Sequence, residues 1–318
     1  MSKVRIGVAG ANGAFGSKHL DALSQIDNVE IVAAMATTLE KANGVADKYS
    51  IPNRFDNYDD MLGLSDLDAV ILATPTQIHA EQGIKAMTAG KHVLIEIPMA
   101  DTLADSEALV AKQKETGLVA MAGHVRRFNP SHQWVHNKIV AGELSIQQMD
   151  IQTYFFRRTN MNAKGEPRSW TDHLLWHHAC HSIDLFRYQA GEDVTEVHAV
   201  QGPVHPDLGI AMDMSILMKT ESGKLCTLSL SFNNDGPLGS YFRYICDNGT
   251  YISSYDDLFD GHNNQIDVSG VDVSLNGIEL IDREFVSAIL DNREPNSSLQ
   301  QCLPAMKIMH EIEQKMTS

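Results

Sequence analysis

Short apolar runs alternate with amphipathic segments through the first 125 residues. The apolar runs predict strands at Val4–Ala9, Glu30–Ala36, Leu67–Thr74, His92–Glu96 and Val119–Gly123. Apolar positions three and four residues apart predict helices from the glycine-rich segment through Leu23 and at Thr37–Tyr49, His79–Ala89 and Ser106–Thr116. Strands separated by helices of about ten residues are typical of a parallel sheet covered on both faces.

From residue 146 onward the dominant hydrophobic period is two. Strands are predicted at Gln147–Phe156, Val194–Gln201, Met212–Lys219, Leu225–Phe232, Tyr241–Cys246 and Thr250–Ser253. Alternation with one polar face indicates an antiparallel sheet that helices cover on one side. Helices are predicted from Pro130 to about Ala141 and, at the end of the chain, at Glu279–Leu290 and Ser298–Met316. The other face carries small hydroxyls and is either open or used for self-association as a homodimer or homotetramer.

The two patterns predict two domains in this chain of 318 residues. Residues 1–124 are expected to form an α/β domain with a doubly wound parallel sheet of the Rossmann type. Residues 125–318 are expected to form an α+β domain with an open, mainly antiparallel sheet. The active site is expected in the cleft between the two domains.

Three glycines lie where the first strand turns into the first helix. Gly10, Gly13 and Gly16 occupy the position at which backbone amides and a helix N-terminus can hold a pyrophosphate. Alone the spacing also fits a tight turn, but its place in the first strand–helix unit favours a dinucleotide. The segments 73–76 and 96–98 follow the fourth and fifth strands, at the carboxyl edge where such sheets bind ligands. The residues expected at the dinucleotide are Gly10, Asn12, Gly13, Ala14, Phe15, Gly16, Thr37, Thr38, Thr74, Pro75, Thr76, His79, Glu96, Ile97 and Arg127.

The end of the second strand bears on the choice of dinucleotide. NAD sites usually have an Asp or Glu there to bind the ribose 2′-hydroxyl, whereas this chain reads Met-Ala-Thr-Thr at 35–38. The hydroxyls of Thr37 and Thr38, with Lys41 nearby, would tolerate a 2′-phosphate. We therefore predict NADP, with NAD possible. Alternatively Thr37 only caps the following helix, in a T-x-x-E capping box with Glu40.

Charge and cysteine usage narrow the class of protein. The net charge of −16 argues against nucleic acid or an anionic membrane as a partner. The four cysteines are widely spaced without a C-x-x-C pair, which indicates reduced thiols and a cytoplasmic protein, with no metal site. No apolar run approaches the ~18 residues of a membrane helix.

One segment reverses the acidic balance. Between His124 and Arg187 there are eight Lys and Arg against five Asp and Glu, with seven of the fourteen histidines. Guanidinium groups suit planar carboxylates or phosphates, and imidazoles transfer protons near neutral pH. A positive region in a negative protein predicts a pocket for a small anion.

Several motifs resemble the glucose–fructose oxidoreductase / inositol dehydrogenase family. They are the glycine turn, A-T-P-T at 73–76, E-I-P at 96–98, R-R-F-N-P at 126–130 and H-x-x-D-L at 181–185. The resemblance covers the whole chain and implies hydride transfer from a substrate alcohol to NAD(P). Longer runs at 123–133, 153–163, 168–179 and 231–239 resemble members that oxidise the cyclic hemiacetal of a dicarboxylated semialdehyde to a lactone, in aromatic-compound catabolism.

The chain departs from the commonest family pattern at three positions. Ile97 stands where the family has a Lys, and His177 stands where it has an Asp. Asn12 lengthens the usual G-x-G-x-x-G turn by one residue. The first two departures agree with the semialdehyde-oxidising subgroup, whereas the third alters the turn expected to contact the phosphates.

The resemblance and the residue chemistry together predict site roles. His181, which matches the family's catalytic His, is favoured as the base that takes the hydroxyl proton, with His177 second. Helical spacing places both on one face of a helix with His173. The alternative is that these histidines are structural residues of the core without a catalytic role. The candidates for binding the substrate carboxylates are His124, Arg126, Arg157, Arg158 and Arg168.

Other functions remain open at this point. One alternative is an NAD(P)-dependent dehydrogenase of another small carboxylated alcohol or hemiacetal. A second is a non-catalytic dinucleotide-sensing protein. A third is a metal hydrolase that uses His173, His177 and His181 as ligands, which the dinucleotide domain disfavours.

Overall fold

The computed structural model describes residues 3–161, 165, 167–168, 171–270 and 277–317. Their contacts define two compact units. Residues 3–125 and 277–303 form the first unit, and residues 126–270 and 304–317 form the second. The sequence predicts that everything after residue 124 belongs to the second domain, whereas the structure groups 277–303 with the first unit.

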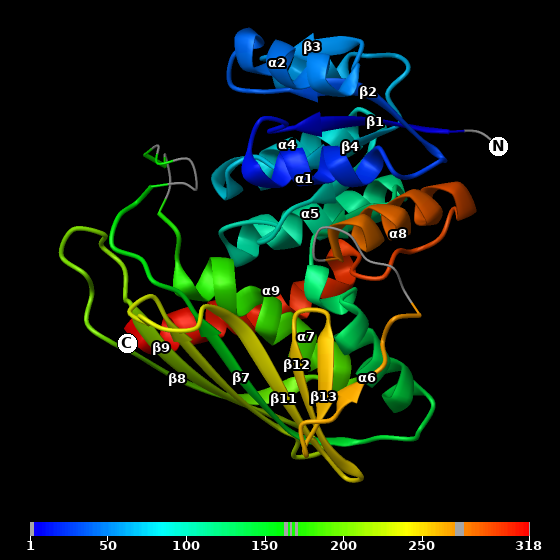
Figure 1. Ribbon diagram of the computed structural model, residues 1–318. Coiled ribbons are helices and arrows are strands. Elements are labelled where there is room, and N and C mark those ends of the chain that lie inside the picture. The colour runs from blue at the N-terminus through cyan, green and yellow to red at the C-terminus, as the bar shows by residue number, and fades with distance from the viewer. Residues whose placement is uncertain (1–2, 162–164, 166, 169–170, 271–276, 318) are drawn as a thin grey trace. The chain divides into compact units, whose positions relative to one another are not determined.

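The first unit contains a six-stranded parallel sheet in the order β3-β2-β1-β4-β5-β6 (Figure 1). The strands are β1 (Val4–Ala9), β2 (Val29–Met35), β3 (Asn53–Phe55), β4 (Ala69–Leu72), β5 (His92–Ile95) and β6 (Ala120–Ala122). The sequence predicts all of them except β3, whose Asn-Arg-Phe sequence forms no apolar run. The order reverses between β1 and β4, which confirms the doubly wound α/β class.

Helices cross between these strands. They are α1 (Ala14–Leu23), α2 (Leu39–Tyr49), α3 (Tyr58–Leu62), α4 (His79–Thr88) and α5 (Leu103–Thr116), with short 3-10 turns at η1 (Thr76–Ile78) and η2 (Val125–Arg127). Because such crossovers are right-handed and the order reverses, helices cover both faces of the sheet. The later helix α8 (Ile278–Asp291) packs against α1, which explains why this segment groups with the first unit.

The start of α2 differs from the sequence-based expectation. Thr38, not Thr37, is the N-cap, and its side chain accepts a hydrogen bond from the Lys41 backbone N–H. The capping box predicted for Thr37 and Glu40 is therefore wrong by one residue. As a consequence, the Thr37 hydroxyl is not used by the cap.

The second unit contains an eight-stranded sheet in the order β14-β13-β12-β11-β7-β10-β9-β8. Its strands are β7 (Ile146–Tyr154), β8 (Val194–Gln201), β9 (Asp213–Thr220), β10 (Leu225–Ser231), β11 (Gly239–Cys246), β12 (Gly249–Ser254), β13 (Asp257–Asp260) and β14 (Gln265–Ile266). All neighbours are antiparallel except β7 and β10. The predicted open, mainly antiparallel sheet is confirmed.

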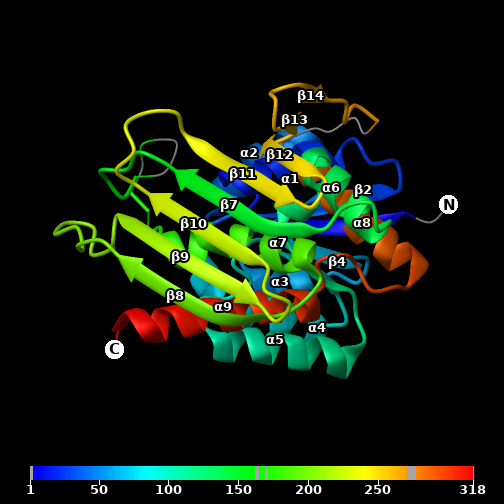
Figure 2. The same cartoon turned by 90° about the horizontal axis from the view of Figure 1, so that it is seen from below.

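Helices cover one face of this sheet and leave the other open (Figure 2). They are α6 (Pro130–Val140), η3 (Leu174–Ala179), α7 (Cys180–Ala190) and the second-unit part of α9 (Leu299–Thr317). Met214, Ile216 and Met218 of β9 are buried beneath them, whereas Leu217 between them is 44 % exposed on the open face. This alternation is the one that the hydrophobic period predicts.

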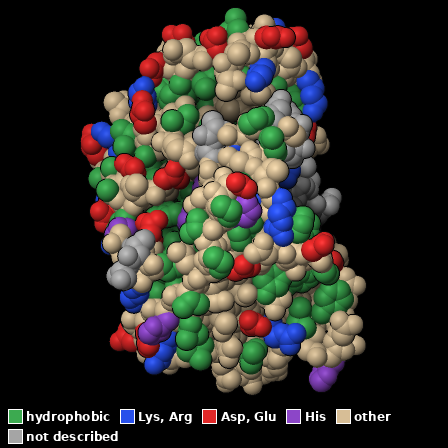
Figure 3. Space-filling model, turned by 90° about the vertical axis from the view of Figure 1, so that its left-hand side faces the viewer, with side chains coloured by type: hydrophobic (Ala, Val, Ile, Leu, Met, Phe, Trp, Pro, Cys, Tyr) green, Lys and Arg blue, Asp and Glu red, His purple; other side chains and the backbone are tan. Residues whose placement is uncertain are grey.

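The surface agrees with the composition. Acidic side chains are scattered over the face shown in Figure 3, in keeping with the net charge of −16. Among the described residues, no helix is long and apolar enough to cross a lipid bilayer.

Candidate functional site

The turn between β1 and α1 is built around glycines that the backbone requires. Gly10 adopts φ +79°, and a Cβ there would lie 2.3 Å from the Ala73 carbonyl oxygen. A Cβ on Gly16 would lie 2.2 Å from the Gly10 carbonyl oxygen. Gly13 is the extended N-cap of α1, whose first turn carries no acidic side chain. The turn therefore fits an anionic pyrophosphate at the helix N-terminus, even with Asn12 added.

The end of β2 presents a hydroxyl and a cation to solvent. Thr37 and Lys41 are exposed, and the Lys41 Nζ lies 3.5 Å from the Thr37 Oγ1. No acidic side chain occurs at 35–38. A hydroxyl and an ammonium group are suited to contact an anion, whereas the carboxylate that usually binds a ribose hydroxyl at this position is not present.

The carboxyl ends of β4 and β5 are joined through His79. Its Nδ1 lies 2.9 Å from the Pro98 carbonyl oxygen and its Nε2 lies 2.8 Å from the Thr74 carbonyl oxygen. The ring is 1 % exposed, and burial lowers the pKa of His79. His79 thus holds the two strand ends in position, and the Thr74 hydroxyl donates to Gln82 at 2.7 Å.

A buried charge cluster lies behind the same edge and joins Glu96 of the E-I-P segment to His19 and Asp282, which no sequence motif singles out. The His19 Nε2 lies 2.9 Å from Glu96, and its Nδ1 lies 2.8 Å from Asp282 on α8. His19 and Asp282 are fully buried. Burial alone lowers the pKa of His19, but the charges and hydrogen bonds of Asp282 and Glu96 outweigh it and raise the pKa to about 10. The imidazolium therefore fixes the Glu96 carboxylate at the end of β5.

This cluster is expected to make the free energy of unfolding decrease as the pH becomes alkaline. Because the folded pKa of His19 exceeds the unfolded value of about 6.5, its contribution is complete below pH 6.5 and is lost as the pH rises through about 10. We expect the unfolding free energy from urea titrations to fall over this range by an amount on the order of several kcal/mol. In Asp282→Asn the fall should be much smaller. Parallel pH profiles for the two proteins would contradict the assignment.

In the second unit, three predicted site residues and His178 meet at one carboxylate, that of Asp172. Asp172 forms ion pairs with Arg157 and, at 3.0 Å, with Arg168. Its Oδ1 lies 2.9 Å from the His178 Nε2 and 3.8 Å from the His177 Nδ1. Burial raises the pKa of Asp172, but the His178 hydrogen bond and the charges of His178 and Arg157 lower it well below the ordinary value. Asp172 is not among the site residues that the sequence predicts.

His177 and His178 lie on a π-helix rather than on the α-helix that the sequence predicts. η3 spans Leu174–Ala179, and His173 is its extended N-cap, so the predicted stripe begins outside the helix. The His177 Nδ1 accepts the His173 backbone N–H at 2.8 Å. Burial, opposed by Asp172, lowers the pKa of His177 to about 4. π-helical turns often occur at functional sites, and here the turn orients the His177 ring.

A metal site on these histidines is not assembled in the described part of the chain. A cation would need three ligand atoms close together, yet no set from His173, His177 and His181 lies within 4.8 Å of one another. The hydrolase alternative therefore has no geometric support. His181 lies on α7, one turn beyond His177, and is partly exposed.

The remaining predicted residues differ in their surroundings. Arg127 is buried and binds Asp184 through two nitrogens, at 2.6 and 2.7 Å. Arg126 is buried, whereas Arg158 is exposed and donates to the Asn233 Oδ1 at 3.1 Å. His124 is buried in the first unit, just after β6.

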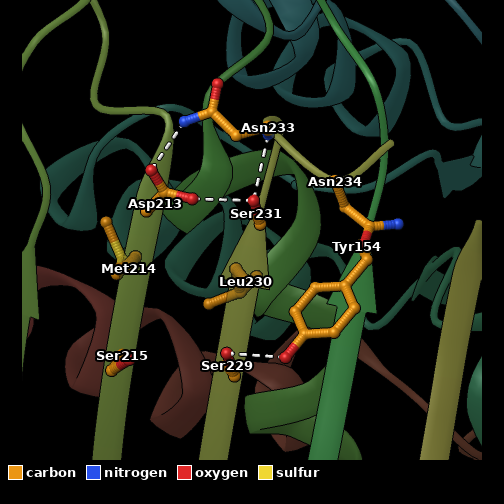
Figure 4. Close-up of a pocket in the computed structure, with 9 residues that line it drawn as sticks. All are labelled: Tyr154, Asp213, Met214, Ser215, Ser229, Leu230, Ser231, Asn233 and Asn234. Carbon is orange, nitrogen blue, oxygen red and sulfur yellow. Dashed lines mark hydrogen bonds between the residues drawn. The ribbon is translucent and has the colours of Figure 1, made fainter. Parts of the chain in front are cut away.

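A hollow lies on the open face of the second sheet (Figure 4). It has a volume of about 400 Å³ and is lined by Tyr154, Asp213, Met214, Ser215, Ser229, Leu230, Ser231, Asn233 and Asn234. Its polar groups bind one another: Tyr154 donates to Ser229 at 3.0 Å, and Ser231 and Asn233 both donate to Asp213 at 2.7 Å. These contacts favour a structural surface over a reactive one.

Comparison with known proteins decides the family. The profile described as "Oxidoreductase family, NAD-binding Rossmann fold" matches residues 4–124, and the profile "Bacterial oxidoreductases, C-terminal" matches residues 130–272. The chain is a member of the glucose–fructose oxidoreductase / inositol dehydrogenase family. As a member of this family it is an oxidoreductase with an NAD-binding Rossmann domain.

Relatives within the family differ widely in similarity. The chain is 64 % identical over 310 residues to the 4-carboxy-2-hydroxymuconate-6-semialdehyde dehydrogenase of Sphingobium sp. (strain NBRC 103272 / SYK-6), covering 98 % of each chain. It is 28 % identical over 197 residues to the inositol 2-dehydrogenase of Salmonella typhimurium, covering 61 % of this chain and 56 % of the relative. A levoglucosan dehydrogenase solved with NADH and levoglucosan shares the fold, with a TM-score of 0.88, 19 % identity and coverage of 99 % and 97 %.

Proposed function

We propose that this family member oxidises the cyclic hemiacetal of 4-carboxy-2-hydroxymuconate-6-semialdehyde to 2-pyrone-4,6-dicarboxylate, a step of protocatechuate 4,5-cleavage. The observation that carries the proposal is the 64 % identity over 98 % of the chain to a dehydrogenase of that name. The reaction breaks the C–H bond of the hemiacetal carbon and the O–H bond of its hydroxyl. A bound nicotinamide supplies the hydride acceptor, and a protein base takes the proton.

The side chains of the second unit support this chemistry. We propose that His181 takes the hydroxyl proton, and that His177 donates a hydrogen bond from Nε2, since its Nδ1 already accepts the His173 N–H. Arg126, Arg157, Arg158 and Arg168, with His124, are proposed to bind the two carboxylates. Arg157 and Arg168 share the single charge of Asp172, so the three groups together keep one positive charge.

The test is direct. The purified protein is incubated with the enzymatic ring-cleavage product of protocatechuate and NADP or NAD, while the absorbance of reduced nicotinamide is followed. We expect reduction with one equivalent of the lactone, identified by mass spectrometry. If the nicotinamide were reduced only with another carboxylated alcohol or hemiacetal, that compound would be the substrate. If no such compound led to reduction, a non-catalytic dinucleotide sensor would be favoured.

We further propose that NADP is preferred and that its 2′-phosphate lies near Thr37 and Thr38. The exposed Thr37 hydroxyl and Lys41 ammonium support this, as does the absence of an acid at 35–38. Thr37→Asp puts a carboxylate beside the phosphate dianion. It should weaken NADP binding at least about tenfold and NAD binding less than about threefold in fluorescence titrations of the reduced forms. Thr37→Ser is the control, and equal losses for both cofactors would place the 2′-phosphate elsewhere.

Assembly and location are proposals of the same kind. The open sheet face, with exposed Leu217 and Tyr241, supports self-association as a homodimer or homotetramer. The four cysteines are buried and form no disulfide in the described part of the chain, which supports residence in the reducing cytoplasm.

A further inference from the structure

The arginines of the second unit differ in whether a carboxylate compensates their charge. Arg127 is paired with Asp184, and Arg157 and Arg168 share Asp172. Arg158 is exposed, so water solvates it. Among the described residues, no ion pair joins Arg126 to a carboxylate.

Arg126 is nevertheless buried. Its side chain is only 8 % exposed, and its Nε is enclosed without a hydrogen-bond partner. Its Nη1 donates to the Asn129 Oδ1 at a long 3.3 Å. Burial lowers the pKa of Arg126, and Tyr255 and Asp256 offset this only in part, yet a guanidinium stays charged at neutral pH. An unpaired buried charge costs free energy, so the protein retains Arg126 against its own stability.

The surroundings hold this guanidinium in a fixed place. It lies over the Tyr255 ring at 4.8 Å and near the Phe242 ring at 5.8 Å, distances typical of cation–π contacts. Tyr255 has a left-handed backbone, φ +52°, which is uncommon for a bulky residue. Its loop is tied down, because Ser131 donates to the Tyr255 carbonyl and Asn129 donates to Asp256 at 2.7 Å. Asp256 is thereby engaged with Asn129, and Arg126 contacts the neutral side chains of Asn129 and Tyr255 rather than a carboxylate.

We propose that Arg126, on its Tyr255 and Phe242 platform, is the receptor for one substrate carboxylate and makes the enzyme select carboxylated over neutral substrates. The identity of the substrate rests on the proposed function. The bound carboxylate supplies the anion that Arg126 otherwise lacks, with two N–H donors in bidentate geometry. Arg157 and Arg168 contribute less to this selection, since Asp172 already compensates one of their two charges.

The test measures binding rather than turnover, so that it does not depend on the proposed reaction. 2-Pyrone-4,6-dicarboxylate and its neutral dimethyl ester are titrated calorimetrically into the full chain saturated with NADP. Arg126→Met should weaken the dicarboxylate roughly 30- to 1,000-fold and leave the ester within about twofold. Arg126→Lys keeps the positive charge but loses the planar guanidinium that binds a carboxylate through two N–H groups. Its affinity for the dicarboxylate should lie between those of the native protein and Arg126→Met. Arg187→Met, which removes an arginine paired with Asp193, should change the affinity for neither the dicarboxylate nor the ester.

Thermal stability provides a second readout. Arg126→Met should raise the Tm in the absence of ligand, because it removes an uncompensated buried charge. Arg127→Met should lower it, because it leaves Asp184 buried and unpaired. If Arg126 had a purely structural role, the Tm of Arg126→Met would be lowered like that of Arg127→Met.

The outcomes of these experiments distinguish a failure of the Arg126 inference from a failure of the proposed function. Unchanged dicarboxylate affinity in Arg126→Met, or no dicarboxylate binding by the native protein, overturns the inference. A parallel loss of NADP affinity overturns it as well, and assigns Arg126 to a cofactor phosphate. If Arg126→Met loses dicarboxylate binding but the native protein does not oxidise the hemiacetal, the proposed function fails and the inference stands.

Discussion

Replacing His181 with Asn should lower kcat by about 10²- to 10⁴-fold while leaving NADP affinity within about twofold. Asn preserves hydrogen-bonding capacity and approximate size but cannot take a proton at neutral pH. Proton removal from the hemiacetal hydroxyl accompanies hydride loss, so its absence should affect kcat rather than cofactor binding. Steady-state kinetics and fluorescence titration of NADPH measure the two effects separately.

His177→Gln is the matched comparison on the same segment and should cost less. Because the His177 Nδ1 accepts the His173 N–H, the neutral ring carries its proton on Nε2 and serves as a donor. The pH profile of kcat separates the two histidines further. With a pKa of about 4, His177 would lose basicity only below about pH 5, whereas an ordinary imidazole is protonated below about 6.5.

An acid limb of the kcat profile that disappears in His181→Asn would support His181 as the base. If His177→Gln loses most of kcat and His181→Asn does not, the roles are exchanged. Full activity in both variants would mean that neither histidine is the base and that η3 and α7 have a structural role.

Gly16→Ala should weaken dinucleotide binding roughly 5- to 150-fold and lower the unfolding free energy by ~1–3 kcal/mol. The added Cβ would lie 2.2 Å from the Gly10 carbonyl oxygen and 2.9 Å from the Ala11 Cα, which are backbone atoms that cannot rotate away. Such overpacking costs ~1–3 kcal/mol, and a backbone shift that relieves it moves the amides expected to bind a pyrophosphate, which lowers the affinity by a comparable free energy. NADPH titration and urea unfolding measure the two effects.

Two glycines provide controls for this prediction. A Cβ on Gly13 would lie 3.1 Å from the Gly10 carbonyl oxygen, so Gly13→Ala should weaken binding only a few-fold. Gly44 in α2 faces open space, with no atom within 4 Å of where a Cβ would lie, so Gly44→Ala should leave binding unchanged. Equal effects at Gly13 and Gly16 would show that the close approach to Gly10 is not what limits the turn.

The layers of both units can be predicted from the amino-acid sequence. Apolar runs separated by helices indicate the parallel sheet, and the alternation at Met214, Ile216 and Met218 indicates the one-sided antiparallel sheet. Both signals are strong because burial on a sheet face repeats along a continuous stretch of chain. The short strands β3, β13 and β14 are not predicted, since their two to four residues mix polar and apolar side chains and form no continuous apolar run.

Local geometry is predictable only to within a residue or a turn type. The cap of α2 lies at Thr38, which Lys41 rather than an acid follows by three residues, so the T-x-x-E pattern at Thr37 indicates the wrong hydroxyl. The histidine segment is predicted as an α-helix, whereas Leu174–Ala179 forms a π-helix. Spacing alone does not distinguish the two, since the same side-chain pattern can accompany either backbone hydrogen-bond period.

The pairing of charges, by contrast, depends on the tertiary fold. His19 and Asp282 are 263 residues apart in sequence, and Arg157 reaches Asp172 from the segment after β7, whereas Arg168 precedes Asp172 by four residues. A carboxylate that compensates a buried cation has no required sequence distance, so residue type predicts four similar arginines at the anion site. Burial and pairing separate them: Arg157 and Arg168 have Asp172, Arg158 has solvent, and Arg126 is enclosed without an ion pair to a carboxylate among the residues described. The reason is physical, because the free energy of a charge depends on its neighbours in space rather than on its neighbours in the chain.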